Sequence, residues 1–252
     1  MKSMKIFYMA VATIVLLSAH NNIYAQLQSK INFAFGVVTT DILGDNPAKK
    51  PMVATNTSQD AVTGGSFKYT QPGLRLKTTY IIEEMPNLRF QGNIDYLFFG
   101  GKERVVINSK IVHYLTHDIN IASLGFGAEY VWADLDFANA KLYSGINILL
   151  SSFHNIGAEI YEDYLELPQF SQTKKLPSKD AALRLGGTVK LIGVEGRLRQ
   201  NFFVNTGVSI GSLNLIGRDD ARGELLTPLA LLETGESMVH ILQVYISLQY
   251  NM

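Results

Sequence analysis

Histidine is the residue type in this chain that could bind a metal ion or act as a base. His113 and His117 are four residues apart. In a strand this spacing separates the side chains by roughly 13 Å, because a strand rises about 3.3 Å per residue. A metal ion needs its ligands within roughly 2.0–2.3 Å. The pair therefore predicts no metal site, and we expect both residues in a loop or at a strand end.

His240 is the histidine with candidate catalytic neighbours. Ser237 and Glu236 precede it closely, and a serine, a histidine and an acid form the machinery of many hydrolases. Such a set could serve lipid deacylation. Its spacing matches no established motif, however, and residues of these types are often neighbours by chance. We therefore predict no catalytic, cofactor-binding or metal-binding residue and no enzyme activity.

Glycine-rich and acidic segments are the other candidates for ligand binding. SLGFGAEY and GGTVK lack the strand-to-helix context and the Lys-Ser/Thr pair of phosphate loops. We expect their glycines to make room inside a tightly curved sheet. The run YEDYLELPQ could bind calcium or a partner, but exposed loops carry such residues routinely, so we interpret it as a solvated loop.

The N-terminal segment predicts export. Lys2 and Lys5 precede the apolar core Ile6–Ala19, and Ile-Tyr-Ala follows as a suitable cleavage site. The core is shorter than the roughly 20 apolar residues of a membrane-spanning helix. We therefore expect residues 1–25 to be a cleaved signal peptide and residues 26–252 to form one exported domain.

The composition argues against several kinds of partner. The chain of 252 residues has 22 acidic and 22 basic residues, so no overall field would recruit nucleic acid. It contains no cysteine, which excludes thiolate metal sites and disulfides. We expect neither a cofactor nor nucleic-acid binding.

Apolar and polar residues alternate with a period of two after residue 30, as in half-buried strands. Eight strands are predicted, near residues 31–39, 74–82, 88–99, 123–132, 141–150, 183–191, 201–211 and 239–252. Ile119 and Ile121 break the parity of the fourth strand, which predicts a bulge or a change of face. Long connections, starting near Asp41, Gly100, Ser151 and Ile216, alternate strictly with short ones. In an up-and-down sheet, this alternation places all the long connections at one end.

The pattern resembles the small bacterial outer-membrane β-barrels of the OmpA and OmpX type, over residues 27–252. LGFGAEYVW and SLNLIGRDD are similar to segments of the outer-membrane β-barrel-domain proteins of Bacteroidetes-like bacteria. The resemblance implies an all-β fold, an eight-stranded antiparallel up-and-down transmembrane barrel with four long external loops and three short periplasmic turns. It also implies a bacterial outer-membrane location, contact with outer-membrane lipids and insertion by the barrel-assembly machinery. We expect a monomer.

In hydrocarbon every backbone group must be paired, so the last strand should pair with the first. Apolar side chains should then face outward, among them Phe35, Leu76, Ile94, Leu185, Val208 and Ile246. The inward faces should carry Arg75, Lys77, Arg89, Asp95, Glu129, Lys141, Arg184 and Lys190, besides Asn93 and Gln243. Eight strands leave room inside only for side chains. We therefore expect an ion-paired plug in which Asp95 and Glu129 contact some of the cations.

Aromatic residues are expected at both rims of the barrel, as in membrane-interface belts. Tyr80, Trp132, Phe202 and Tyr250 fall near the short turns, and Tyr96 and Phe98 near the other end. The predicted function is a non-enzymatic integral outer-membrane barrel with a structural or surface-interaction role through its long loops. The alternatives are a small anion-preferring pore, a lipid-modifying outer-membrane enzyme and a soluble lipocalin-like carrier.

Overall fold

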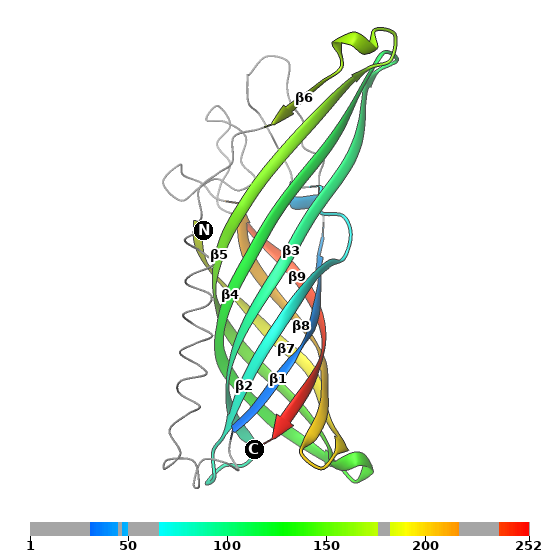
Figure 1. Cartoon of the computed structure of the whole chain (residues 1–252). Coiled ribbons are helices and arrows are strands. Elements are labelled where there is room, and N and C mark those ends of the chain that lie inside the picture. Colours follow the sequence, from blue (N-terminus) through cyan, green and yellow to red (C-terminus); the bar gives the residue numbers. More distant parts are fainter. Residues whose placement is uncertain (1–30, 45–46, 50–65, 176–181, 217–236, 252) are drawn as a thin grey trace, which may run out of the picture.

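The computed structural model describes residues 31–44, 47–49, 66–175, 182–216 and 237–251 (Figure 1). Its strands are β1 (Ile31–Ile42), β2 (Gln71–Ile81), β3 (Leu88–Asn108), β4 (Ile111–Leu135), β5 (Ala140–Tyr164), β6 (Gln172–Lys175), β7 (Ala182–Arg199), β8 (Phe202–Ile216) and β9 (Ser237–Asn251). Short 3-10 turns are η1 (Pro47–Lys49), η2 (Phe137–Asn139) and η3 (Pro168–Phe170). None of the helical segments in these ranges has the length and apolar character to cross a membrane. The predicted signal peptide lies outside the described residues.

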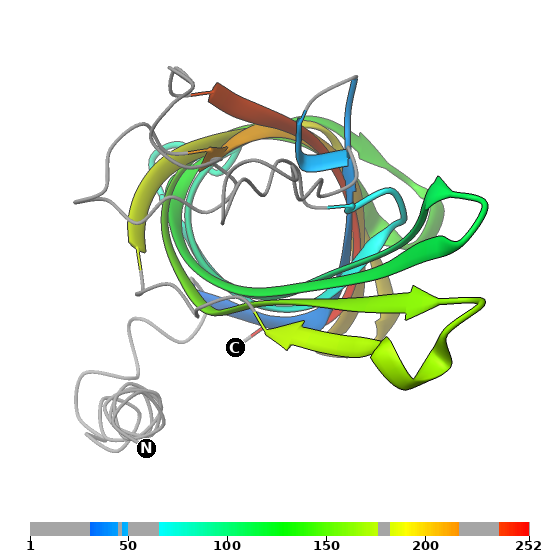
Figure 2. The ribbon, with the colours of Figure 1, turned by 90° about the horizontal axis from the view of Figure 1, so that it is seen from above.

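Eight of the described strands close into a ring (Figure 2). Neighbouring strands are antiparallel, and β4 pairs with β5 while β9 pairs with β1. The β1–β9 seam runs from Asn32 opposite Asn251 to Ile42 opposite Ile241. The predicted up-and-down barrel, closed by the last strand against the first, is confirmed. The short strand β6 pairs with β5 outside the ring.

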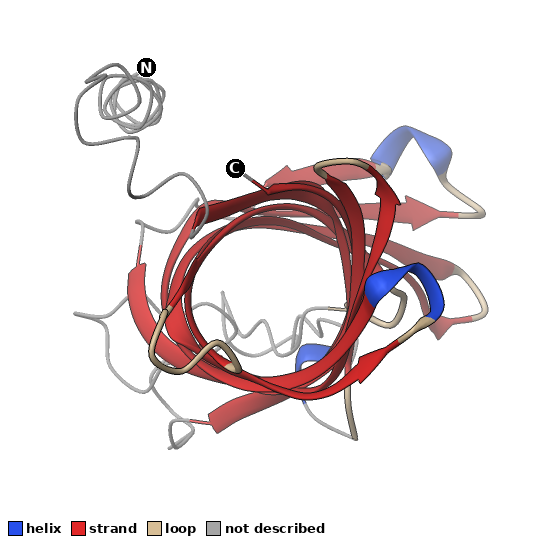
Figure 3. Cartoon of the chain, turned by 90° about the horizontal axis from the view of Figure 1, so that it is seen from below, coloured by secondary structure: helices blue, strands red, loops and turns tan. Residues whose placement is uncertain are grey.

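The three short turns lie together at one end of the barrel, as predicted. The turns at residues 82–87, 136–139 and 200–201 join β2 to β3, β4 to β5 and β7 to β8. They lie at the end that also holds the start of β1 and the end of β9, seen from below in Figure 3. We name this the short-turn end and the opposite one the long-connection end.

Three strands are much longer than the sequence pattern predicted. β3 has 21 residues and β4 and β5 have 25 each, whereas β1 has 12. The segments expected as loops after Gly100 and Ser151 are therefore largely strand, and the run YEDY ends β5 instead of lying in a loop. Val105, Val106 and Val112 are β-branched residues that favour strands. Charged residues next to these valines interrupt the alternation of apolar and polar residues that would have indicated a strand.

The predicted faces of the strands are confirmed. Phe35, Leu185 and Ile246 are 60%, 66% and 54% exposed on the outer wall. Leu76 is also exposed, and Ile94 and Val208 are half-buried on the same outer parity. The residues predicted to face inward, Arg75, Asn93, Arg184 and Gln243, are all buried.

The bulge predicted near Ile119 and Ile121 is present in the pairing of β4 with β5, whereas the two isoleucines keep the inward parity of β4. β4 keeps its register against β3 through this region, so both isoleucines face inward and are fully buried. The irregularity lies on the other side, where the β4–β5 register shifts between Asp118 and Asn120. There Asn155 of β5 has a φ of 52°. The interior therefore becomes apolar at this level.

Candidate functional site

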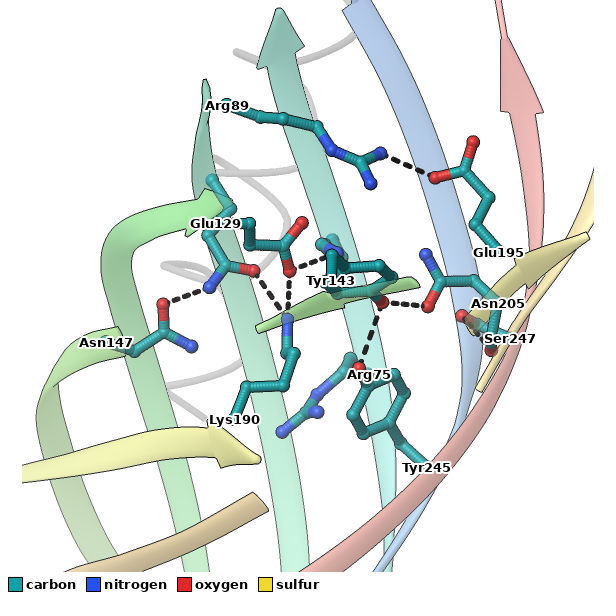
Figure 4. A network of polar contacts seen from close by, with 12 residues as sticks. Arg75, Arg89, Glu129, Tyr143, Asn147, Lys190, Glu195, Asn205, Tyr245 and Ser247 are labelled. Atoms are coloured by element: carbon teal, nitrogen blue, oxygen red, sulfur yellow. Dashed lines mark hydrogen bonds and ion pairs between the residues drawn. The ribbon is translucent and has the colours of Figure 1, made fainter. Parts of the chain in front are cut away.

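Ion pairs fill the interior toward the short-turn end (Figure 4). Arg75 donates to both carboxylate oxygens of Asp95, each at 2.7 Å. Lys77 donates to Glu129 at 2.7 Å, and Lys190 contacts the same carboxylate oxygen. The predicted plug, with Asp95 and Glu129 as the anions, is confirmed. Because Lys77, Glu129 and Lys190 come from β2, β4 and β7, this cluster spans the lumen.

Glu195 is an anion of the plug that the sequence reasoning missed. It accepts from Arg89 at 2.6 Å, and both side chains are 3% exposed. The sequence reasoning placed Glu195 in the short connection GVEGRLRQ, whereas β7 continues to Arg199. Lys141, predicted to face inward, is half-buried near the short-turn end. The extension of β7 thus adds a negative charge that balances Arg89.

Two buried tyrosines stand at the centre of the cluster. The Tyr143 hydroxyl donates to Asn205 at 2.5 Å and lies 3.0 Å from the Tyr245 hydroxyl. A Cβ at Gly193 would collide with the Tyr143 ring, and one at Gly207 with the Tyr245 hydroxyl. Gly193 and Gly207 are cross-strand partners on β7 and β8. These inward glycines therefore make the space that the two rings occupy, as expected for glycine in a narrow barrel.

The tyrosine rings also contact the cations. Lys77, Arg89 and Lys190 lie 5.0, 4.9 and 5.1 Å from the centre of the Tyr143 ring. Within about 6 Å, the quadrupole of an aromatic ring attracts a cation. The Tyr143 ring thus attracts Lys77, Arg89 and Lys190, which lie in a layer that has fewer carboxylates than cations.

An apolar layer closes the interior toward the long-connection end. Its buried members include Val38, Leu97, Phe99, Ile119, Ile121, Leu149, Phe153, Leu213, Val239 and Ile241. Phe67, from the first long connection, reaches into this layer and is fully buried. Its ring stacks on His117 at 5.0 Å and meets Phe99 edge-on at 5.5 Å. Phe67 thus places an aromatic side chain of the first long connection inside the barrel.

Aromatic residues gather on the outer wall near the short-turn end. Phe33, Tyr250 and Phe202 are successive cross-strand partners, and the rings of Phe202 and Tyr250 are 5.3 Å apart. Tyr80 and Trp132 are also exposed on this part of the wall. At the other end, Tyr96 and Phe98 contact each other at 4.9 Å. Both predicted aromatic groups thus occupy the expected rims.

A sheet projects beyond the barrel at the long-connection end (Figure 1). We name it the blade; it comprises residues 102–116 of β3, β4 and the turn between them, and residues 159–175 of β5, η3 and β6. Beyond the barrel β4 pairs with β3 and β5, and β6 pairs with β5 from Glu159 to Glu162. Its tip carries the exposed side chains Leu165, Leu167 and Phe170. The blade therefore places an apolar surface far from the barrel wall.

Glu162 holds β6 to the blade, and its charge makes this contact sensitive to pH. Burial raises its pKa, but hydrogen bonds from Lys174 and Gln172 and the nearby His113 outweigh burial and lower the pKa below 4.5. The carboxylate therefore stabilises β6 above the unfolded pKa, and this stabilisation is lost as pH falls through the lower, folded pKa. We expect the β6 amides to lose protection from hydrogen exchange in acid, after correction for intrinsic rates. A Glu162→Gln variant showing the same acid-induced loss would contradict this assignment.

The histidines lie apart from one another, as their spacing predicted. His113 is 3.9 Å from Glu162, His117 packs on Phe67, and His154 is 2.9 Å from the Tyr96 hydroxyl. Within the described ranges, no three His, Asp or Glu side chains could hold a metal ion.

His240 has a serine neighbour that its sequence position did not suggest. The side chain of Ser237 and all of Glu236 lie outside the described residues. Instead, Ser212 of β8 lies opposite His240, with 2.8 Å between Oγ and Nδ1. Sequence proximity could not reveal this pair, because it depends on the β8–β9 register.

No protein-family model matches the chain, and no curated protein matches it. Among solved structures, Neisserial surface protein A is 13% identical with a TM-score of 0.43, over 88% of this chain and 97% of that one. Ail, the attachment invasion locus protein of Yersinia pestis, is 10% identical with a TM-score of 0.38, over 88% and 98%. OprG from Pseudomonas aeruginosa is 13% identical with a TM-score of 0.41, over 88% and 96%.

The strand pairing and side-chain faces of this chain define its class. It is a closed, eight-stranded antiparallel β-barrel with an apolar outer wall and buried ion pairs in its interior. The ion-paired layer, the apolar layer and the blade are its candidate functional features.

Proposed function

We propose that this protein is an integral bacterial outer-membrane barrel that acts without enzyme activity, in a structural or surface-interaction role through its blade. The observation that carries the proposal is a blade with an apolar tip, raised above a wall suited to lipid. A soluble carrier would turn its aliphatic side chains inward, whereas Phe35, Leu185 and Ile246 point outward.

The height of the apolar wall supports the membrane location. On β9 the outward residues between Tyr250 and His240 are Leu248, Ile246, Val244 and Leu242. Ten residues of a strand tilted by about 45° rise roughly 24 Å, close to the apolar band of about 25 Å in outer-membrane barrels. The wall therefore changes from apolar to polar where a bilayer would end.

The ion pairs and the apolar layer inside the barrel favour surface interaction over solute passage as the function of this protein. A pore needs a continuous path for water, and an eight-stranded barrel has room only for side chains. Here the cations lie beside carboxylates or tyrosine rings, and Phe67 packs in the apolar layer above them. We therefore expect negligible conductance from the pure protein in planar bilayers. Discrete conductance steps would favour the anion-preferring pore.

The blade has two features that suit contact with another surface. Within the described residues, the end of β3 from Arg104 to Asn108 has a strand partner on one side alone, whereas the part nearer the barrel already contacts residues 67–71. A further strand could pair with this end. The tip residues Leu165, Leu167 and Phe170 are 53%, 49% and 60% exposed. An exposed apolar patch outside the membrane is typical of an interaction surface.

Removing the blade should abolish adhesion but leave the barrel intact. We expect a variant in which short turns replace residues 103–115 and 159–175 to keep the heat-resistant gel mobility of a folded barrel, because the strand ladder of the ring is retained. Cells displaying this variant should no longer adhere to polystyrene or aggregate with one another, whereas cells with the intact chain should do both.

A single substitution provides a matched test of the tip. Phe170→Ser removes an exposed aromatic side chain from the blade, and Phe137→Ser removes one that is 84% exposed at the short-turn end. Adhesion should fall with the first change and not with the second. Equal adhesion of the blade-less and intact chains would refute a role of the blade in surface interaction.

A further inference from the structure

The outer wall contains a groove that neither the ion-paired interior nor the blade explains. It has a volume of about 500 Å³ and is lined by residues of β7, β8 and β9 and by residues just after β1. Gly187 lies on the outward parity of β7, between the exposed Leu185 and Val189. The absence of a side chain at this position hollows the wall.

The lining of the groove is apolar along one part and polar at its end. Leu43, Val189 and Ile210 supply aliphatic surface, whereas Ser212 and His240 supply a hydroxyl and an imidazole. Ser212 and His240 are cross-strand partners on β8 and β9, with 2.8 Å between Ser212 Oγ and His240 Nδ1. Both side chains lie on the outer face of the barrel wall. The groove thus has the amphipathic character of a lipid molecule.

The depth of the polar pair relative to the apolar wall identifies the region of the bilayer that it would meet. His240 follows the outward aliphatic series of β9 at the long-connection end. By the rise estimated above, it stands at the outer boundary of the apolar band. Ester and phosphate groups of lipids occupy this level, and acyl chains lie immediately below it.

We propose that the groove binds one lipid of the surrounding bilayer, with an acyl chain along Val189 and Ile210 and its ester or phosphate oxygens hydrogen-bonded by Ser212 and His240. This inference rests on the proposed membrane location. The occupant is a lipid because the groove is continuous with the wall that lipid chains cover. An aliphatic hollow on the outer wall beside two hydrogen-bonding groups matches the two chemically distinct parts of such a ligand.

In this proposal the Ser212–His240 pair binds the lipid and does not catalyse its hydrolysis. A serine hydrolase also needs a group that orients the histidine and donors that stabilise an oxyanion. Within the described part of the chain, no carboxylate is hydrogen-bonded to the His240 ring. The pair therefore supplies hydrogen bonds to a lipid and leaves its ester bonds intact.

Native mass spectrometry of the full-length protein, released from detergent containing palmitoyl-oleoyl phosphatidylglycerol, would test the proposal. The wild-type chain should retain one lipid. Val189→Trp fills the groove and should abolish retention, whereas Val37→Trp should not, although both valines are similarly exposed, at 48% and 49%. His240→Ala should weaken retention about tenfold, as expected for a lost hydrogen bond to a charged group.

Folding of each variant is checked by its heat-dependent gel mobility and by flotation with phosphatidylglycerol vesicles. Lipid retention that is unchanged by Val189→Trp, or that is lost equally in Val37→Trp, would overturn the proposal that the groove binds a lipid. Release of free fatty acid that depends on Ser212 or His240 would also overturn it, because the pair would then be catalytic. A folded chain that floats with vesicles but retains no lipid rejects the groove alone, whereas failure to float rejects the proposed membrane location.

Discussion

Glu129→Gln is expected to lower the free energy of unfolding by about 3–5 kcal/mol, the cost of breaking a buried ion pair by removing one partner. The carboxylate is fully buried and contacts both Lys77 and Lys190. Without its charge, the two ammonium groups would remain close together in the interior. Urea titration in phosphatidylcholine vesicles, followed by the fluorescence of the chain's single tryptophan, would measure the loss.

Glu103→Gln is the matched control for this prediction. Glu103 pairs with Lys68 near the long-connection end, where the two side chains are 20% and 43% exposed. A surface pair of this kind contributes about 0–1 kcal/mol. Equal losses from the two substitutions would show that the plug does not depend on the shared carboxylate.

Ile246→Arg should cost about 2–4 kcal/mol in a bilayer, because a lipid-facing cation near the midplane loses its hydration without gaining a partner. Ile246 is 54% exposed on the outer wall and lies between Tyr250 and His240, the two ends of the apolar series on β9. The same vesicle titration measures the effect.

Depth distinguishes this prediction from a general intolerance of arginine on the wall. Leu198 is 67% exposed but lies near the short-turn end of β7. Leu198→Arg should therefore cost only about 0–1 kcal/mol, as at a membrane interface. Similar costs at both depths would argue against a bilayer around this wall.

The ring and its two faces could be predicted from the sequence because the side-chain period of a strand is two. Alternation alone places Leu242, Val244, Ile246 and Leu248 on one face and Gln243, Tyr245 and Ser247 on the other. This assignment needs no information about a partner strand. Asp95 and Glu129 could be assigned to the plug for the same reason.

Features that depend on the length of a strand or on its register with a neighbour could not be predicted from the side-chain period. Glu195 was missed because charged residues around it suggested a turn, and the blade because its hairpin residues alternate irregularly. Phe67 was missed because a residue in a long connection has no periodicity that places it in a barrel mouth. The Ser212–His240 pair required the β8–β9 register.

The ion-paired layer has a consequence for how the chain folds. Its contacts join strands that are not neighbours: Arg89 reaches Glu195 across 106 residues of sequence, and Tyr143 reaches Tyr245 across 102. Contacts of such large sequence separation form slowly, because the loop entropy is lost before they are made. Until β7 pairs with the earlier strands, Arg89 lacks Glu195 and Glu129 lacks Lys190, so a partly assembled sheet exposes these charges to water or lipid. Closure of the ring therefore satisfies these charges in a single cooperative step, and a chain truncated before β9 should gain little of the stability of the complete barrel.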